Sequence, residues 1–378
     1  MSRMKPATIA VTGLNATDNP APGVGVLRSL RDRARSKHAP SDRLVGLAYD
    51  ALDPGVYAPD VVSDVFLLPY PSSSVEPFLE RLEYVHESEG LDVLVPTLDA
   101  ELPAFIALSS RLARMGIATF LPSREQFELR SKARLAALGA RAGVSVPKTV
   151  VVHSVEELGR VHKELPYPFF VKGVFYGAAL ATGFDEAVTA FHKAAAQWGL
   201  PIIVQAPAYG EELNVIGLGD GEGGLVSAVA MKKLVLTDKG KGWAGVTIKD
   251  PELLAVAERF AAASKWRGGF EAEVMRTKEG RYELLEINPR FPAWVYLATA
   301  AGVNLPAALV DLALGERPKV ERDYEVGKLF VRIAIDQIAS VADLERIVTA
   351  GEVRRAPARP AAEEEAAPRS EQRVHAVS

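Results

Sequence analysis

Two hydrophobic patterns alternate along the first third of the chain. Short apolar runs typical of buried strands are separated by stretches whose apolar residues recur at helical spacing. The predicted strands cover residues 8–13, 44–49, 65–68 and 91–96, and the predicted helices cover 26–34, 75–88 and 102–115. Strands that alternate with helices predict a parallel sheet with crossover connections. Ligands of such sheets bind beyond the carboxyl ends of the strands, where this sequence has Gly13, Asn15, Asp50 and Thr97–Asp99.

The pattern changes after residue 123. One basic helix is predicted over Arg124–Ala142, followed by short strands at 150–153, 169–172 and 202–205 and helices at 155–164 and 186–198. Longer strands then follow at 214–218 and 225–236, with a helix at 251–264 and a hairpin at 270–288. We therefore predict an N-terminal α/β domain over residues 1–123, two further units over 124–206 and 207–350, and a disordered tail over 351–378.

The hairpin at 270–288 is the most informative segment. Its two halves read as strands, and Lys278-Glu279-Gly280 reads as the turn. A two-residue loop at Glu279-Gly280 fixes the register. The predicted cross-strand pairs are Glu273 with Glu286, Glu271 with Asn288, and Met275 with Leu284. Period-two alternation then places the three glutamates and Asn288 on one face, with Arg290 projecting from the same strand end.

Two carboxylates directly opposite each other repel and weaken a sheet, so a cation is expected to compensate them. Oxygen ligands suit Mg²⁺, which proteins usually hold with one or two carboxylates and the phosphates of a substrate. The alternative is an exposed hairpin in another register, with solvated acidic residues. A solvated face does not explain why Asn-Pro-Arg closes a strand that is apolar on its other face, which argues against this alternative.

The motif Glu286-Ile-Asn288-Pro-Arg290, with Glu273 thirteen residues before Glu286, resembles the metal and catalytic signature of the ATP-grasp superfamily. Residues 7–123 are similar to the α/β domain that precedes the grasp in biotin carboxylases and carbamoyl-phosphate synthetases. The resemblance implies an N-terminal parallel-sheet α/β domain followed by a two-part ATP-grasp fold, with a linker helix and a lid subdomain over 124–206. It also implies ATP and Mg²⁺ (or Mn²⁺) as cofactors, Glu273, Glu286 and Asn288 as metal ligands, and Arg290 as a catalytic residue.

The same resemblance assigns nucleotide contacts upstream. Lys132 and Lys172 correspond to the two nucleotide-facing lysines, and the second of these reaches the phosphates. Gln205, Ala206 and Ala208 match the hinge that holds adenine, Glu212 matches the acid that binds ribose, and Lys232 or Lys233 is expected to face the phosphates. Taken alone, each of these lysines and Glu212 can also be interpreted as a solvated residue at a strand end or in a turn.

Two loops complete the predicted site. Residues 172–179 would cover the phosphates, although they hold only two glycines where many relatives have a glycine-rich run. Phe175 and Tyr176 at the tip of this loop are expected either to cover the substrate or to make the lid more apolar. A lid over about residues 146–206 is expected to close over the nucleotide. The segment Lys239–Trp243 is a further candidate for phosphate or substrate contacts.

Composition excludes several other classes. The 378 residues include 44 Lys and Arg against 48 Asp and Glu. This near balance provides no positive electrostatic field that would attract nucleic acid or an anionic membrane. The chain has no cysteine, and its six histidines lack zinc-ligand spacing. The apolar stretches near the N-terminus and over Tyr296–Gly315 are too short or too interrupted for a signal peptide or a membrane span. A cytoplasmic protein is expected, with no nucleic-acid or membrane partner.

The favoured function is an ATP-dependent ligase that joins a small-molecule carboxylate, such as an amino acid or peptide, to an amine through an acyl phosphate, releasing ADP and phosphate. A homodimer is allowed. One alternative activates bicarbonate for carboxyl or carbamoyl transfer, although the chain lacks a biotinyl domain and a second synthetase half. Another is a nucleotide-binding module without turnover. A dinucleotide-binding site over residues 8–50 is disfavoured because Gly23-Val-Gly25-Val-Leu-Arg28 lacks the third glycine and follows a long loop.

Overall fold

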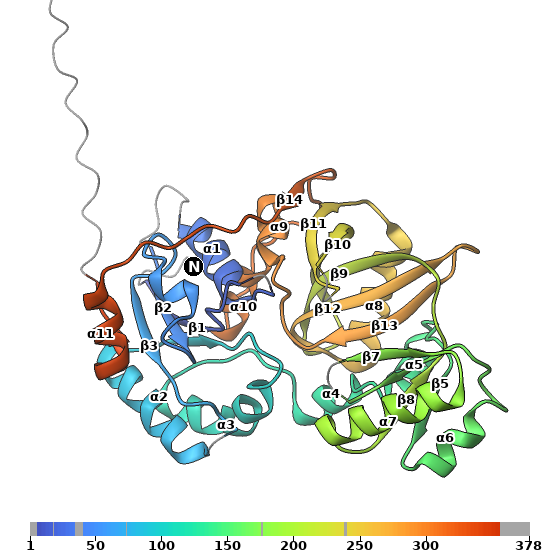
Figure 1. Cartoon of the computed structure of the whole chain (residues 1–378). Helices are drawn as coiled ribbons and strands as arrows, with labels where there is room; N and C mark the ends of the chain where they lie inside the picture. The colour runs from blue at the N-terminus through green and yellow to red at the C-terminus, as the bar shows by residue number, and fades with distance from the viewer. Residues whose placement is uncertain are drawn as a thin grey trace, which may run out of the picture.

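The computed structural model describes residues 6–17, 19–34, 41–72, 74–174, 177–237 and 240–355. Over these residues the chain forms three sheets, of five, six and four strands. Figure 1 shows the five-stranded sheet with its helices on one side of the molecule and the other two sheets on the opposite side. The predicted Phe175, Tyr176 and Lys239 lie outside the described residues.

The N-terminal sheet has the predicted parallel core. Its strands β1 (Thr8–Thr12), β2 (Arg43–Ala48), β3 (Asp64–Leu67) and β4 (Val93–Val95) are arranged in the order β3-β2-β1-β4. The connecting helices are α1 (Gly23–Ala34), α2 (Val75–Glu89) and α3 (Leu102–Met115), with a 3₁₀ turn at η1 (Pro54–Tyr57). The strand order changes direction between β1 and β4, so the segments that follow these two strands flank the switch point of the sheet.

The end of the described chain returns to this sheet. After α11 (Val341–Ala350), β15 (Glu352–Val353) pairs antiparallel with β3. Ile347 and Val353 are fully buried in the core that contains the N-terminal strands. The predicted tail over 351–378 therefore begins too early, and residues 356–378 lie outside the described part.

The single helix predicted over 124–142 is wrong. Two helices, α4 (Arg124–Leu129) and α5 (Leu135–Ala142), are separated by a turn that carries Lys132. Ser123 begins α4 through a capping box with Gln126, and α4 has no buried residue. Leu135 and Leu138 of α5, in contrast, are buried in the core beneath the six-stranded sheet. The interruption lets the second helix pack while the first remains at the surface.

The four-stranded sheet lies within the segment that is predicted to be the lid, which is called the lid unit below. Its strands are β5 (Thr149–Val152), β8 (Ile202–Gln205), β6 (Phe169–Lys172) and β7 (Ala178–Ala181), in that order, with helices α6 (Val155–Val161) and α7 (Phe184–Trp198). The predicted short strands are confirmed apart from their ends. Strand β7 is not predicted, because its first two residues fall in the predicted phosphate loop and three of its four residues are exposed.

The six-stranded sheet is antiparallel and has the order β13-β12-β9-β10-β11-β14. Its strands are β9 (Gly210–Asp220), β10 (Leu225–Leu236), β11 (Gly242–Thr247), β12 (Arg267–Thr277), β13 (Tyr282–Asn288) and β14 (Leu329–Val331). One face packs on α5 and α8 (Pro251–Ser264) around Phe260 and Phe270. Ile216 and Met231 on the other face share a core with N-terminal strands and with α9 (Val295–Ala300) and α10 (Leu305–Ala313). This second face therefore meets the N-terminal domain.

The predicted register of the β12–β13 hairpin is partly confirmed. Glu273 pairs with Glu286, and Glu271 pairs with Asn288. An irregularity after Glu273 then shifts the register by one residue, so the predicted pairing of Met275 with Leu284 is wrong. Because of this shift Leu284, which is 1% exposed, enters the core, and the connection between the strands spans 278–281 rather than two residues.

No helix in the described part of the chain is both long and apolar enough to cross a membrane. The apolar stretch at 296–315 is divided between α9 and α10, which are short helices packed at the junction between domains.

Candidate active site

The paired carboxylates Glu273 and Glu286 lie on the face of the six-stranded sheet that meets the N-terminal domain. Asn288, two residues beyond Glu286, donates from Nδ2 to Oε1 of Glu273 over 3.0 Å. This contact directs the amide nitrogen toward the carboxylate, so Oδ1 faces the other way. The three residues predicted as metal ligands are thus brought together at the end of one hairpin.

Lysines surround this carboxylate pair. Lys132 Nζ lies 3.5 Å from Oε1 of Glu286, and Lys233 Nζ lies 3.6 Å from Oε2 of Glu273. Burial opposes ionisation of Glu273, but the charge of Lys233 and then that of Lys241 hold its pKa below the usual range. Positive charge from lysines therefore surrounds Glu273, one carboxylate of the pair.

The second carboxylate is less well compensated. Burial raises the pKa of Glu286 above its usual range, and the charges of Glu273 and Asp99 add to this effect against that of Lys132. A carboxylate with this environment gains most when a further cation approaches.

The two neighbouring lysines of β10 lie on opposite faces of the sheet. Lys233, with a side chain only 8% exposed, contacts Glu212 and Glu273 on the carboxylate face. Lys232 is 42% exposed and contacts Glu211 on the other face. Of the two predicted candidates, the structure brings Lys233 to the site and leaves Lys232 outside it.

This arrangement predicts a clear contrast between two single substitutions. We expect Lys233→Met to reduce turnover by about 10²-fold or more, since it removes a buried charge between two carboxylates. Lys232→Met, on the exposed face, should stay within about threefold of the wild-type rate. Steady-state rates of ADP formation measure both. Equal losses in the two variants would contradict the assignment of the faces.

Lys172 ends β6 of the lid unit and points to the same space. Its Nζ donates to Oε1 of Gln205 over 2.6 Å, and Gln205 Nε2 donates to the hydroxyl of Thr149 over 3.0 Å. Burial and the charge of Lys132 lower the pKa of Lys172 to about 8, against opposing contributions from Glu286 and Glu273. The influence of these three groups on its pKa places the amine near the carboxylate pair.

The predicted adenine hinge follows β8. The side-chain oxygen of Gln205 accepts from Lys172. The backbone N–H of Ala206 donates to the carbonyl of Lys148, and Ala208 is half-buried in the connection to β9. Glu212, the predicted ribose ligand, accepts from Lys233. The roles of these four residues remain predictions.

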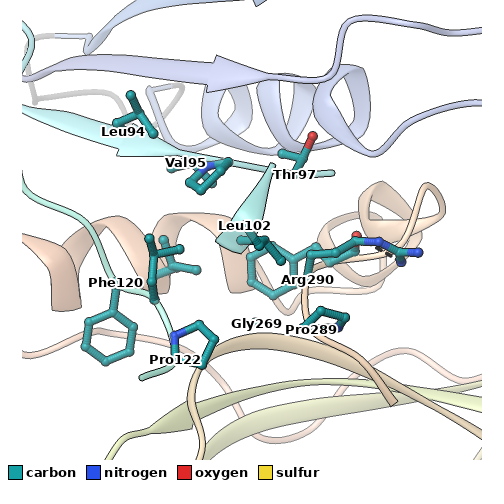
Figure 2. Close-up of a pocket in the computed structure, with 13 residues that line it drawn as sticks. Leu94, Val95, Thr97, Leu102, Phe120, Pro122, Gly269, Pro289 and Arg290 are labelled. Atoms are coloured by element: carbon teal, nitrogen blue, oxygen red, sulfur yellow. Dashed lines mark hydrogen bonds between the residues drawn. The ribbon is translucent and has the colours of Figure 1, made fainter. Parts of the chain in front are cut away.

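Arg290 connects the hairpin to the N-terminal domain. Its Nε lies 3.1 Å from Oδ2 of Asp99, just after β4, and its Nη1 lies 3.5 Å from Oε2 of Glu271. Figure 2 shows Arg290 beside Thr97 at this junction, where the structure has a cavity of about 20 Å³, room for about one water molecule. Sequence reasoning placed Asp99 at a strand end and Glu271 on the correct face, but gave neither a role.

The donor set fits a hard divalent cation bound together with a phosphate. No group of three or more His, Cys, Asp or Glu residues suited to a metal occurs in the described ranges. Two carboxylates and one amide oxygen leave about half of an octahedral Mg²⁺ coordination shell to phosphate oxygens and water, and this ion usually keeps such ligands.

Comparison with known proteins identifies the fold. Residues 201–332, which include the sheet and the hairpin, match the profile of the family described as ATP-grasp in the biosynthetic pathway with Ter operon. The biotin carboxylase domain of 2-oxoglutarate carboxylase from Hydrogenobacter thermophilus superposes with a TM-score of 0.67 at 16% identity, covering 86% of this chain and 74% of that one. The chain has the ATP-grasp fold. The expected fold class and the resemblance stated from the sequence are confirmed.

Other solved ATP-grasp structures give the same result. Biotin carboxylase from Campylobacter jejuni has a TM-score of 0.67 at 16% identity and covers 85% of this chain and 74% of that chain. N5-carboxyaminoimidazole ribonucleotide synthetase has a TM-score of 0.62 at 14% identity and covers 86% and 81%. The first two proteins were solved with MgADP, ADP and bicarbonate and with an ATP complex, and the third with ADP. Curated proteins give no match to this sequence.

Proposed function

We propose that this protein is an ATP-dependent ligase that activates a carboxylate by phosphorylation and transfers the acyl group to an amine. The observation that carries the proposal is the carboxylate pair Glu273–Glu286, flanked by lysines from the lid, the linker and β10, and facing the strand ends of the N-terminal sheet. The acidic groups suit a divalent cation, and the basic groups suit the phosphates of a nucleoside triphosphate bound with it.

In this proposal each group has a defined task. Glu273, Glu286 and the Asn288 oxygen hold Mg²⁺, which neutralises charge on the phosphates. Lys172 and Lys233 bind phosphate oxygens, and Arg290 stabilises negative charge on the transferred phosphoryl group. The carboxylate substrate attacks the γ-phosphorus and releases ADP. The amine then attacks the acyl phosphate and releases phosphate.

The direct test measures ADP release by purified protein with ATP, Mg²⁺ and a pooled set of amino acids, with products identified by mass spectrometry. The proposal expects ADP release that depends on the pool and a product joined by an amide bond. ADP release that depends on bicarbonate instead would favour a carboxyl-transfer enzyme. Tight nucleotide binding without turnover under any condition would favour a regulatory module.

Nucleotide affinity is expected to fall as pH rises through about 8, where Lys172 loses its proton in the free protein. A phosphate favours the charged amine, so binding just above this pH should be accompanied by proton uptake. Calorimetry in buffers of different ionisation enthalpy measures the uptake. Lys172→Arg keeps its charge throughout this range and should bind without uptake. Undiminished uptake in that variant would assign the proton to another group.

A further inference from the structure

Glu271 is a buried carboxylate beside the site that none of the roles above uses. It lies on β12, opposite Asn288 and two residues before Glu273, and is 5% exposed. We propose that Glu271 is a positioning residue, which fixes the orientations of Asn288 and Arg290 for cation binding and phosphoryl transfer. This inference rests on the proposed function.

One oxygen of Glu271 is held by the scaffold. Its Oε1 accepts from Nε1 of Trp294 over 2.7 Å and from Nδ2 of Asn214 over 2.8 Å. Both donors are buried, Asn214 completely. Trp294 comes from the segment after the hairpin and Asn214 from β9, so the carboxylate is fixed from two directions.

The other oxygen faces the site. Oε2 of Glu271 accepts from Nδ2 of Asn288 over 3.0 Å and lies 3.5 Å from Nη1 of Arg290. The amide nitrogen of Asn288 therefore contacts two carboxylates, those of Glu271 and Glu273. An amide flip would turn its oxygen toward both negative charges, which strongly disfavours that orientation. The oxygen is thereby kept available for a cation.

Arg290 is held in a similar way from two domains. Glu271 contacts Nη1 from the six-stranded sheet, and Asp99 contacts Nε from the N-terminal domain. Two carboxylates on different nitrogens fix the plane of the guanidinium, which a single partner does not.

The surroundings require an acceptor at both oxygens of residue 271. A buried carboxylate is costly unless several donors compensate it, and Glu271 has three neutral donors and one guanidinium. Asn214 gives its amide nitrogen to Glu271 while its own Oδ1 is buried without a hydrogen-bond partner. A glutamine at position 271 would instead direct N–H groups at donors, and an apolar residue would remove an acceptor from all four donors.

The test compares Glu271→Gln with wild type and with Glu279→Gln, a matched change at the exposed hairpin turn. Mn²⁺ affinity in the presence of ADP is measured by electron paramagnetic resonance, and ADP affinity without metal by calorimetry. We expect Mn²⁺ affinity and kcat to fall about 10–100-fold in Glu271→Gln, with metal-free ADP affinity unchanged. Glu279→Gln should behave as wild type.

Unchanged Mn²⁺ affinity and kcat in Glu271→Gln would overturn the positioning role. If that variant does not fold, Trp294→Phe removes one scaffold donor and keeps the charge, and it should lower Mn²⁺ affinity several-fold. Wild-type affinity in Trp294→Phe would then overturn the inference. If the wild-type protein binds Mn²⁺ and ADP and the variants bind them with the same affinity, only the positioning role of Glu271 is rejected. A wild-type protein that binds neither rejects the proposed function itself.

Discussion

Glu286→Gln is expected to lower turnover by about 10²–10³-fold while the protein stays folded. The substitution keeps the volume of the side chain and removes the charge of the carboxylate that the protein compensates least. Its partners are the opposing Glu273 and, 3.5 Å away, Lys132. Removing the charge also relieves repulsion between the two glutamates, so thermal stability should be maintained or slightly increased.

Single-turnover rates at saturating Mg²⁺ and thermal melting of the same preparation test this prediction together. Glu273→Gln should be milder than Glu286→Gln, because Lys233 lies 3.6 Å from Glu273 and already supplies positive charge at this position. Glu283→Gln, three residues earlier on the same strand, is the matched control. Wild-type ADP formation by Glu286→Gln would remove this residue from the cation site.

Lys172→Ala is expected to weaken nucleotide binding by about 10–100-fold, the equivalent of losing one hydrogen bond to a charged group. The amine lies at the end of an apolar strand, where it donates a hydrogen bond to the neutral Gln205 and lies over the ring of Phe170. Burial already lowers its pKa, so its removal relieves a desolvation cost and should change the melting temperature little. Affinity and stability should therefore respond very differently.

Calorimetric titration with ADP and Mg²⁺ gives the affinity, and differential scanning calorimetry gives the stability. Lys193→Ala, an exposed lysine on α7 of the same unit, serves as the control. If Lys172→Ala bound ADP as wild type does, Lys172 would be a lid residue that supports Gln205 and does not contact phosphate.

The sequence predicted those features of the site that depend on local pattern. The pairing of Glu273 with Glu286 follows from period-two alternation and the position of a turn, and both are visible in the chain. The irregularity after Glu273 is not, because Leu284 and Leu285 are alike and only the shape of the core selects Leu284. The break between α4 and α5 likewise contains no proline or glycine and depends on what each helix packs against.

Contacts between segments that are distant in the sequence could not be predicted for a different reason. Alternation requires Lys232 and Lys233 to lie on opposite faces, but which face is the carboxylate side depends on how β10 pairs with its neighbours. Asp99 and Arg290 are 191 positions apart, and only the docking of the N-terminal sheet on the hairpin brings them together. A single sequence contains no information on such a pairing.

The return of the chain to its first sheet affects how the protein can be made. Strand β15 and helix α11 fill part of the N-terminal core with Ile347 and Val353. During synthesis, β3 therefore remains an open strand edge of the N-terminal sheet until residues 352–353 have been translated. The N-terminal sheet is therefore complete only when β15 has paired with β3.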